Sequence, residues 1–349
     1  MTAAKNTKDI RAFSQDQLIE EFTNMGEKAF RAKQVYEWLW KKSATSFEAM
    51  TNLSKALRMQ LDAAYSINNI TIKTQQHSED GTIKFAFQLH DGHLIEGVLI
   101  PTADRLTACV SSQVGCSLSC AFCATGFLKR ERNLNPDEVY DQYVLINNAA
   151  LEHFNRPLTN VVFMGMGEPL LNYKNILAGI DRLTNEDSLN ISPKRITVST
   201  AGIAKMIRKL GEDKVKFNLA LSLHATSDEA RNKIMPINEQ NNLEVLVEAL
   251  NYFYQETKGR ITFEYILLDD VNETVDDAKR LIQLARRVPG AKVNIIEYNP
   301  IDQADFHKPE AKQRDLFITT LENAGVTATL RRSRGKDIDA ACGQLANKL

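Results

Sequence analysis

From about residue 105 to residue 330, short runs rich in valine, isoleucine and leucine alternate with longer stretches of helical periodicity. The runs that predict strands are 106–110, 160–164, 195–199, 217–223, 260–268, 292–298 and 326–330. Helical stretches fall between most of them, for example 136–148, 243–257, 274–288 and 310–324. Apolar strands joined by helices are typical of a parallel sheet buried on both faces. This order predicts an α/β fold, a partial or complete βα barrel, whose site lies at the C-terminal ends of the strands.

Residues 13–60 have helical periodicity without intervening strands. The stretch 30–40 brings four apolar side chains to one side at a spacing of three to four residues: Phe30, Val35, Trp38 and Leu39. Ser54 is a plausible N-cap for the helix that follows it. We therefore expect a small N-terminal helical domain with an aromatic core over residues 1–62.

Between residues 67 and 101 the apolar period changes to two. Three β-rich runs, 67–74, 82–89 and 93–100, are separated by the hairpin signals Asp80-Gly81 and Asp91-Gly92. The pattern predicts a three-stranded β-meander over 63–103, which leads into the barrel domain at 104–349.

The charge of the chain is nearly balanced, with 43 basic and 44 acidic side chains in 349 residues. Three local basic runs stand out, in residues 1–60, in 129–132 and in 331–336. Each alone is explained by solvated surface, but three together favour a polyanionic partner. No run approaches the ~20 apolar residues of a membrane span, and no apolar segment follows the polar N-terminus. We expect a cytoplasmic protein with no membrane partner.

Three of the five cysteines lie within eight residues, directly after the first predicted barrel strand. Cys116, Cys120 and Cys123 form a C-x3-C-x2-C pattern, and thiolates bind zinc or iron–sulfur clusters. Structural zinc sites use four protein ligands, commonly as two C-x2-C pairs, and the second pair is missing here. The pattern therefore favours a [4Fe–4S] cluster with one open iron that can chelate a small molecule.

This motif at this place in a barrel resembles the radical S-adenosylmethionine superfamily, where the open iron binds the amino and carboxylate groups of S-adenosylmethionine. The sequence Gly165-Met-Gly-Glu-Pro169 resembles the superfamily's Gly-Gly-Glu-Pro motif and departs from it at Met166. The resemblance implies that Gly167 and Glu168 bind the amino end of the cofactor. It also implies cofactor contacts from five residues that end predicted strands: Ser199, Ser222, Leu223, His224 and Asn299. A satisfied, half-buried histidine remains the alternative for His224.

A narrower resemblance covers residues 17–345. The segments 109–116, 164–172 and 335–345, the last reading Gly-Lys-Asp-Ile-Asp-Ala-Ala-Cys-Gly-Gln-Leu, are similar to the RlmN type of adenine-C2 RNA methyltransferase. That family modifies an adenine of large-subunit ribosomal RNA, and many members also modify an adenine next to the anticodon of transfer RNA. Ribosomal RNA and transfer RNA are thus the implied substrates. An electron donor such as flavodoxin or ferredoxin is the implied partner, and we expect a monomer.

The resemblance also implies a reaction that uses two molecules of S-adenosylmethionine per turnover. Cys342 is matched to the cysteine that is first methylated and then, activated by the 5′-deoxyadenosyl radical, adds to C2 of adenine. Glu96 is matched to the acceptor of the C2 proton. Cys109 is matched to the cysteine that releases the product and leaves a disulfide with Cys342. Without the family, Cys342 and Cys109 would be read as inert core thiols and Glu96 as the solvent face of a strand.

Two alternatives remain open at this point. The related antibiotic-resistance branch methylates C8 of adenine with the same machinery. A non-catalytic iron–sulfur or zinc RNA-binding protein would keep the three-cysteine loop but has no reason to keep Glu96, Cys109 and Cys342 together. Three arginines close to the matched carrier cysteine form a further hypothesis, in which they guide RNA toward it: Arg331, Arg332 and Arg334.

Overall fold

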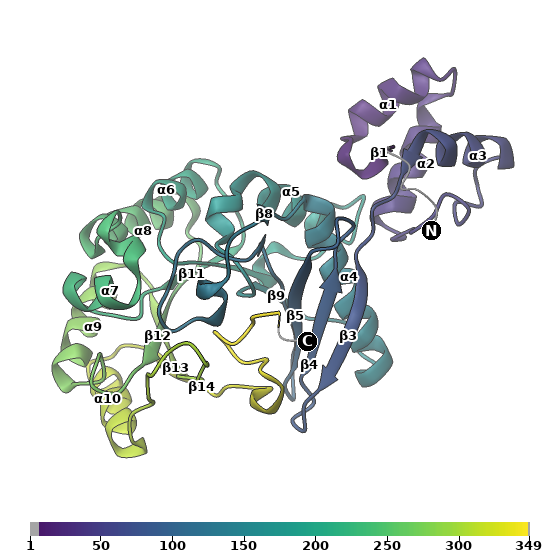
Figure 1. Cartoon of the computed structure of the whole chain (residues 1–349). Coiled ribbons are helices and arrows are strands. Elements are labelled where there is room, and N and C mark those ends of the chain that lie inside the picture. Colours follow the sequence, from purple (N-terminus) through teal and green to yellow (C-terminus); the bar gives the residue numbers. More distant parts are fainter. Residues whose placement is uncertain (1–6, 348–349) are drawn as a thin grey trace.

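A computed structural model describes residues 7–347, and its centre is one curved ten-stranded sheet (Figure 1). The strands lie in the order β14-β13-β12-β11-β10-β9-β6-β5-β4-β3. Seven of them run parallel: β6 Leu106–Cys109, β9 Asn160–Phe163, β10 Ile196–Thr200, β11 Asn218–Ser222, β12 Ile261–Leu267, β13 Lys292–Glu297 and β14 Ala328–Arg331. Each predicted barrel strand is therefore present, with its ends shifted by two residues or fewer.

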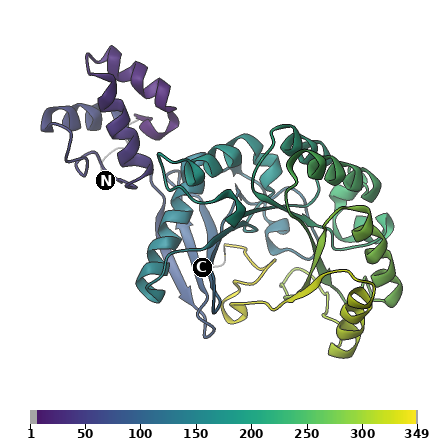
Figure 2. The same ribbon diagram turned by 180° about the vertical axis from the view of Figure 1, so that it is seen from behind.

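The sheet does not close on itself in the part of the chain that the structure describes, because β14 pairs only with β13 and β3 only with β4. The barrel is therefore partial rather than complete. Helices cover its outer face, as both views show (Figures 1 and 2). They are α4 Pro136–Phe154, α5 Tyr173–Thr184, α6 Ala204–Glu212, α7 Asp228–Ile234, α8 Leu243–Thr257, α9 Val275–Arg287 and α10 Ala311–Asn323.

The helical predictions agree with α8, α9 and α10, whereas α4 extends six residues past its predicted end at residue 148. Pro136 occupies the first turn of α4, where its missing N–H costs no hydrogen bond. The helical ranges predicted from the sequence did not name α5, α6 and α7. Between β6 and α4 lies a short antiparallel ribbon of β7 Gln113–Val114 and β8 Arg132–Asn133, which frames the three-cysteine loop.

The predicted β-meander is present as β3 Thr71–His77, β4 Ile83–Gln88 and β5 Leu94–Pro101. Its strands are antiparallel, and β5 pairs with β6. The meander thus extends the barrel sheet directly. Its first strand begins at Thr71 rather than at residue 67.

The N-terminal region contains α1 Gln15–Asn24, α2 Ala29–Trp40 and α3 Lys55–Ala64, with a small parallel pair of β1 Lys8–Asp9 and β2 Tyr65–Ser66. Ser54 caps α3 as expected, because its Oγ accepts from the Leu57 N–H. The predicted apolar side of α2 is wrong in one member: Phe30 is 48% exposed. The buried side of the helix is instead Ala32, Val35, Tyr36, Leu39 and Trp40.

The C-terminal segment after β14, residues 332–347, runs along the mouth of the partial barrel toward the meander (Figure 1). Asp337 accepts hydrogen bonds from Ser78 Oγ at 2.6 Å and from the Glu79 N–H at 3.2 Å, at the β3–β4 turn. Thr125 Oγ1 donates to the Leu345 carbonyl at 2.6 Å. The segment therefore connects the open edge of the barrel to the meander.

None of the helices in residues 7–347 combines the length and apolar content of a transmembrane helix. The division into 1–62, 63–103 and 104–349 stays a prediction, and α3 continues to Ala64, past its first boundary. The prediction that the chain has no signal segment rests in part on residues 1–6, and these lie outside the described residues.

Candidate active site

The three clustered cysteines lie in the loop between β7 and a short 3-10 helix at Ala124–Phe127. The loop is held at both ends: the Cys116 N–H donates to the Leu128 carbonyl at 3.3 Å, and the Gly126 N–H donates to the Cys123 carbonyl at 2.8 Å. Gly126 is required here, because a Cβ atom would lie 2.8 Å from the Cys120 carbonyl oxygen. Local backbone geometry therefore fixes the spacing of the sulfur atoms.

The three sulfur atoms are too far apart to share one zinc ion. Two thiolates bound to one zinc at about 2.3 Å lie no more than about 4.6 Å apart. Within residues 7–347, the only three potential ligand side chains whose atoms all lie within 4.8 Å of one another are Asp269, Asp270 and Glu273. The ligands of an iron–sulfur cluster bind different irons, so such a cluster does not require the three sulfur atoms to lie that close together.

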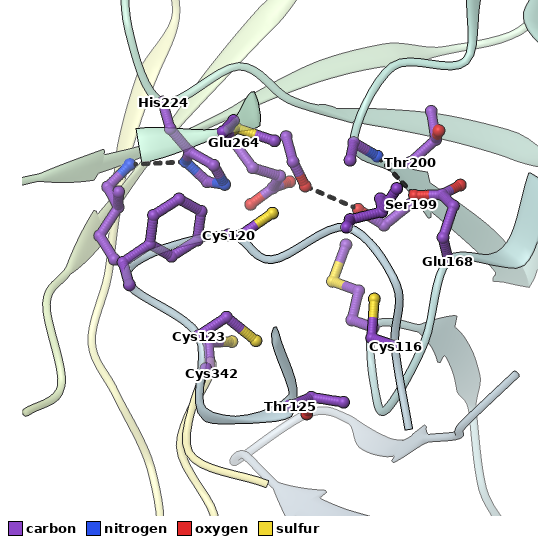
Figure 3. A pocket seen from close by; sticks show the side chains of 18 of the residues that line it. Cys116, Cys120, Cys123, Thr125, Glu168, Ser199, Thr200, His224, Glu264 and Cys342 are labelled. Atoms are coloured by element: carbon purple, nitrogen blue, oxygen red, sulfur yellow. Dashed lines mark hydrogen bonds between the residues drawn. The ribbon is translucent and has the colours of Figure 1, made fainter. Parts of the chain in front are cut away.

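The same cysteines line a cavity at the C-terminal ends of the barrel strands, which we call the cysteine cavity (Figure 3). It encloses about 910 Å³, open solvent included. Burial raises the pKa of the Cys116 thiol to about 11 and also raises the pKa of Cys123. A bound cation is needed to hold such buried sulfurs as thiolates. The lining of the cysteine cavity includes five residues matched to cofactor contacts: Gly167, Glu168, Ser199, Ser222 and His224.

Glu168 joins the ends of β9 and β10 beside the cavity. Its Oε1 accepts from the Leu170 N–H at 2.9 Å, and its Oε2 accepts from the Ala201 N–H at 2.7 Å. Burial raises the pKa of Glu168, and these N–H donors lower it. The preceding Gly167 has φ +92°, and a Cβ atom there would lie 2.5 Å from the Gln113 side chain. The turn that presents Glu168 therefore requires glycine.

His224 reaches the cavity as a neutral imidazole. Its Nδ1 accepts from the Ile266 N–H at 3.1 Å, so the single proton of the neutral ring lies on Nε2. Burial and the neighbouring Arg231 lower the pKa of His224 to about 3. Its ring also packs edge-on against Phe122 of the cysteine loop. His224 can thus donate one hydrogen bond to a ligand across the physiological pH range.

The remaining matched contacts lie differently. Ser199 and Ser222 face the cavity from adjacent strands, with their hydroxyl oxygens 3.4 Å apart. Leu223 is buried and is not among the residues that line the cavity. Asn299 lies beside the C-terminal segment, where its Nδ2 donates to the Cys342 carbonyl at 3.1 Å and its buried Oδ1 has no hydrogen-bond partner. The cofactor roles of all these residues stay predictions.

A second cavity, which we call the Cys109 cavity, adjoins the first. Cys109 and Cys342 both line it, and Cys342 and Cys123 line both cavities. Cys342 is exposed, and Cys109 is 7% exposed at the end of β6. Burial raises the pKa of the Cys109 thiol to about 12. Both cysteines are free thiols, so the predicted disulfide is not observed.

Glu96 on β5 lines neither cavity. It is 1% exposed, and its Oε2 accepts from the Ala346 N–H at 2.8 Å and from the Asn347 N–H at 3.2 Å. Leu345, the residue before these donors, lines the Cys109 cavity. The end of the C-terminal segment therefore separates Glu96 from that cavity.

Glu264 and the structural role of Arg331 were not predicted from the sequence. Glu264 lines the cysteine cavity from β12, and its carboxylate accepts from Asn294 Nδ2 at 2.7 Å and from Arg331 Nη1 at 3.1 Å. Arg331 lines both cavities, whereas Arg332 and Arg334 line only the Cys109 cavity. A glutamate inside an apolar strand was the available signal for Glu264.

An open βα barrel with three cysteines in the loop after its first strand, facing a small-molecule cavity, defines a radical S-adenosylmethionine enzyme. Residues 110–285 match the model of the Radical SAM superfamily, and residues 8–67 match the ribosomal RNA large subunit methyltransferase N-terminal domain. The chain belongs to the RlmN family of radical S-adenosylmethionine methyltransferases. This membership favours neither of the two alternatives, the adenine-C8 branch and a non-catalytic metal protein.

Two curated relatives and one crystal structure illustrate the similarity. The chain is 62% identical to a probable dual-specificity RNA methyltransferase RlmN of Cytophaga hutchinsonii, over 98% of this chain and 93% of that protein. It is 44% identical to the dual-specificity RNA methyltransferase RlmN of Anaeromyxobacter dehalogenans, over 98% and 92%. The crystal structure of a radical SAM methyltransferase from Sphaerobacter thermophilus superposes with a TM-score of 0.91 at 38% identity, covering 97% of this chain and 99% of that one.

Proposed function

We propose that this protein converts adenine to 2-methyladenine in large-subunit ribosomal RNA and in transfer RNA beside the anticodon. The observation that carries the proposal is the position of Cys342 on the wall shared by two cavities. One cavity holds the three cluster cysteines and the other holds Cys109. A methyl carrier needs this position, because it must meet the cofactor on one side and the releasing thiol on the other.

Cys116, Cys120 and Cys123 hold the [4Fe–4S] cluster in this proposal, and Glu168, Ser199, Ser222 and His224 orient S-adenosylmethionine beside it. When bound, the reduced cluster and this cofactor supply a methyl group and a carbon-centred radical. The residues of the chain bind the cofactor and limit the access of water to the cavity. Asn299 fixes the Cys342 backbone through its hydrogen bond to the carbonyl.

Cys342 accepts one methyl group as a thioether and, after loss of a hydrogen atom, forms a carbon–carbon bond to C2 of adenine. Two cofactor molecules are therefore consumed per turnover. Glu96 then accepts the C2 proton, and the electron pair of the C–H bond stays with the ring. Cys109 attacks the Cys342 sulfur, the bond from that sulfur to carbon breaks with its electron pair on carbon, and that carbon takes up the Cys109 thiol proton to complete the methyl group. The unpaired electron left by the radical addition passes back to the electron carrier, and a disulfide remains. A flavodoxin- or ferredoxin-like donor supplies electrons, and the enzyme acts as a monomer.

RNA binding falls to the N-terminal helices and to the basic residues at the Cys109 cavity. Arg332 and Arg334 line that cavity and are suited to phosphate contacts. The target base must leave its stack to reach Cys342, as in other enzymes that modify bases.

The test is nucleoside mass spectrometry after anaerobic reaction of the reconstituted holoenzyme with S-adenosylmethionine, a reductant and ribosomal or transfer RNA. We expect 2-methyladenosine from wild type, and a covalent protein–RNA adduct through Cys342 from the Cys109→Ala variant. A product at 8-methyladenosine would replace the C2 assignment with the C8 branch. No methylated adenine, from protein that cleaves the cofactor, would overturn the proposal.

A further inference from the structure

Lys84 is a buried lysine outside both cavities. It lies on β4, is 4% exposed, and belongs to the buried part of the strand. Lysine is almost never fully buried unless it is paired. Its Nζ lies 3.5 Å from Glu96 Oε1 and 3.5 Å from the Asp339 carbonyl oxygen. Lys84 thus connects the matched proton acceptor to the C-terminal segment.

The register of the meander brings the two side chains together. Ala86 pairs with Glu96, and Lys84 pairs with Val98, across the antiparallel strands β4 and β5. Lys84 and Glu96 are therefore diagonal neighbours on one face of the sheet, within reach of a long side chain. The contact follows from strand pairing rather than from a flexible surface approach.

The two oxygens of Glu96 have different surroundings. Oε2 accepts the two backbone N–H groups of the C-terminal segment, whereas Oε1 lies 3.5 Å from Lys84 Nζ and has no other polar partner within residues 7–347. Burial raises the pKa of Glu96, and the Lys84 charge lowers it. Around its backbone, the Met166 sulfur accepts from the Glu96 N–H, and the Ser111 hydroxyl donates to the Glu96 carbonyl. These neighbours are neutral, so Lys84 is the charge that faces the carboxylate.

We propose that Lys84 is a positioning residue for proton removal: its ion pair with Oε1 keeps Glu96 ionised, and its contact with Asp339 links that state to the C-terminal segment. The inference rests on the proposed function, in which Glu96 accepts the C2 proton. Lys84 itself transfers no proton. A buried carboxylate without this cation would take up a proton from water and could not accept one from the adduct.

The experiment compares four variants of the reconstituted holoenzyme with wild type: Lys84→Met, Lys84→Arg, Glu96→Gln and the control Lys73→Met. Lys73 lies on β3 of the same meander and is exposed. Three quantities are measured separately: methylation of Cys342 by protein mass spectrometry, the covalent protein–RNA adduct on denaturing gels, and release of 2-methyladenosine. Methylation of Cys342 precedes the step that needs Glu96.

We expect Lys84→Met to lose far less Cys342 methylation than product release, to accumulate the adduct as Glu96→Gln does, and to release product at least roughly tenfold more slowly. Product release by this variant should accelerate with rising pH, and the pH range of this acceleration should lie above that of wild type. The reason is that Glu96 needs a higher pH to ionise without Lys84. Lys84→Arg should restore release, and Lys73→Met should match wild type. Amide hydrogen exchange at Ala346 and Asn347 should be faster in Lys84→Met.

Two results would overturn the inference. One is a Lys84→Met variant that releases product as Lys73→Met does, with an unchanged pH profile. The other is an equal loss of Cys342 methylation and product release without rescue by Lys84→Arg, since that pattern marks a purely structural residue. Failure of the proposed function is distinct, because wild type itself would then make no 2-methyladenosine.

Discussion

Gly167 shows how one residue without a side chain supports the site. At φ +92° any other residue is strained by about 1–3 kcal/mol, and a Cβ atom would also meet the Gln113 side chain at 2.5 Å. We expect Gly167→Ala to weaken S-adenosylmethionine binding at least roughly tenfold, because about 1.4 kcal/mol corresponds to that factor. Equilibrium dialysis with labelled cofactor measures the change.

Gly92 provides the matched control for this substitution. It has φ +88°, and a Cβ atom there would meet nothing within 4 Å. Gly92→Ala should lower the melting temperature slightly and leave cofactor affinity unchanged. Equal affinities in the two variants would mean that the turn at Gly167 does not shape the cofactor site.

A motif or a matched segment named residues that the structure brings together, and their roles stay predictions. Cys116, Cys120, Cys123, Glu168 and Cys342 all line the cysteine cavity. Lys84 and Glu264 were missed, because a charged residue in a strand looks like a surface residue until the covering layer is known. The prediction that Phe30 lies on the apolar side of α2 was wrong for a related reason. Aromatic residues occur on several sides of this helix, so spacing alone does not identify its buried side.

Among the elements, the C-terminal segment is held by hydrogen bonds to the meander, to the cysteine loop and to the barrel, and Asp337 provides two of those to the meander. We expect Asp337→Ala to raise amide hydrogen exchange across residues 335–345 and to slow methylation of Cys342, because the carrier then samples more positions. Exchange in α10 should not change. Hydrogen-exchange mass spectrometry resolves the two regions.

Asp315→Ala is the control, because Asp315 pairs with the adjacent Arg314 on the exposed side of α10. It should leave the exchange of residues 335–345 at the wild-type rate. If Asp337→Ala also leaves it unchanged, the segment is held by its other contacts, including the bond from Thr125 to Leu345.

Strands were easier to predict than their closure. A parallel strand buried on both faces produces a short apolar run, so all seven barrel strands were found from the sequence. Whether the sheet closes depends on the partner of the last strand, which no local pattern encodes. In the structure, β14 is the last strand of the sheet. The C-terminal segment follows it at the open side, where a closed barrel would instead have a further strand paired with β14.

At the scale of the whole molecule, Arg11 connects the N-terminal helices to the barrel. Its guanidinium group is buried and pairs with Asp141 at 2.7 Å and Asp137 at 3.2 Å, both on α4. We expect Arg11→Met to lower the free energy of unfolding by about 3 kcal/mol, because two buried carboxylates lose their partner. RNA methylation should fall, while cofactor cleavage without RNA should persist. Denaturant unfolding and the two activity assays measure these effects.

The stability deficit of Arg11→Met should be larger at pH 8 than at pH 5. Burial raises the pKa of Asp137 to about 6, above the unfolded value of about 4, and Arg11 opposes this rise. A carboxyl group with a raised folded pKa loses stabilisation as the pH rises through that pKa, and removing Arg11 raises it further. A deficit independent of pH would show that these carboxylates do not titrate in the variant. Lys33→Met, on the exposed side of α2, is the control.

The wall that the two cavities share has a consequence for inhibitor chemistry. Cys342, Cys123 and Gly343 border both spaces, so no layer of core separates them. A compound with a cofactor-like head in one space and a short arm into the other would pass beside the Cys342 thiol. A mild electrophile on that arm would then meet an exposed thiol between two pockets, and selectivity would come from the pair of pockets rather than from reactivity.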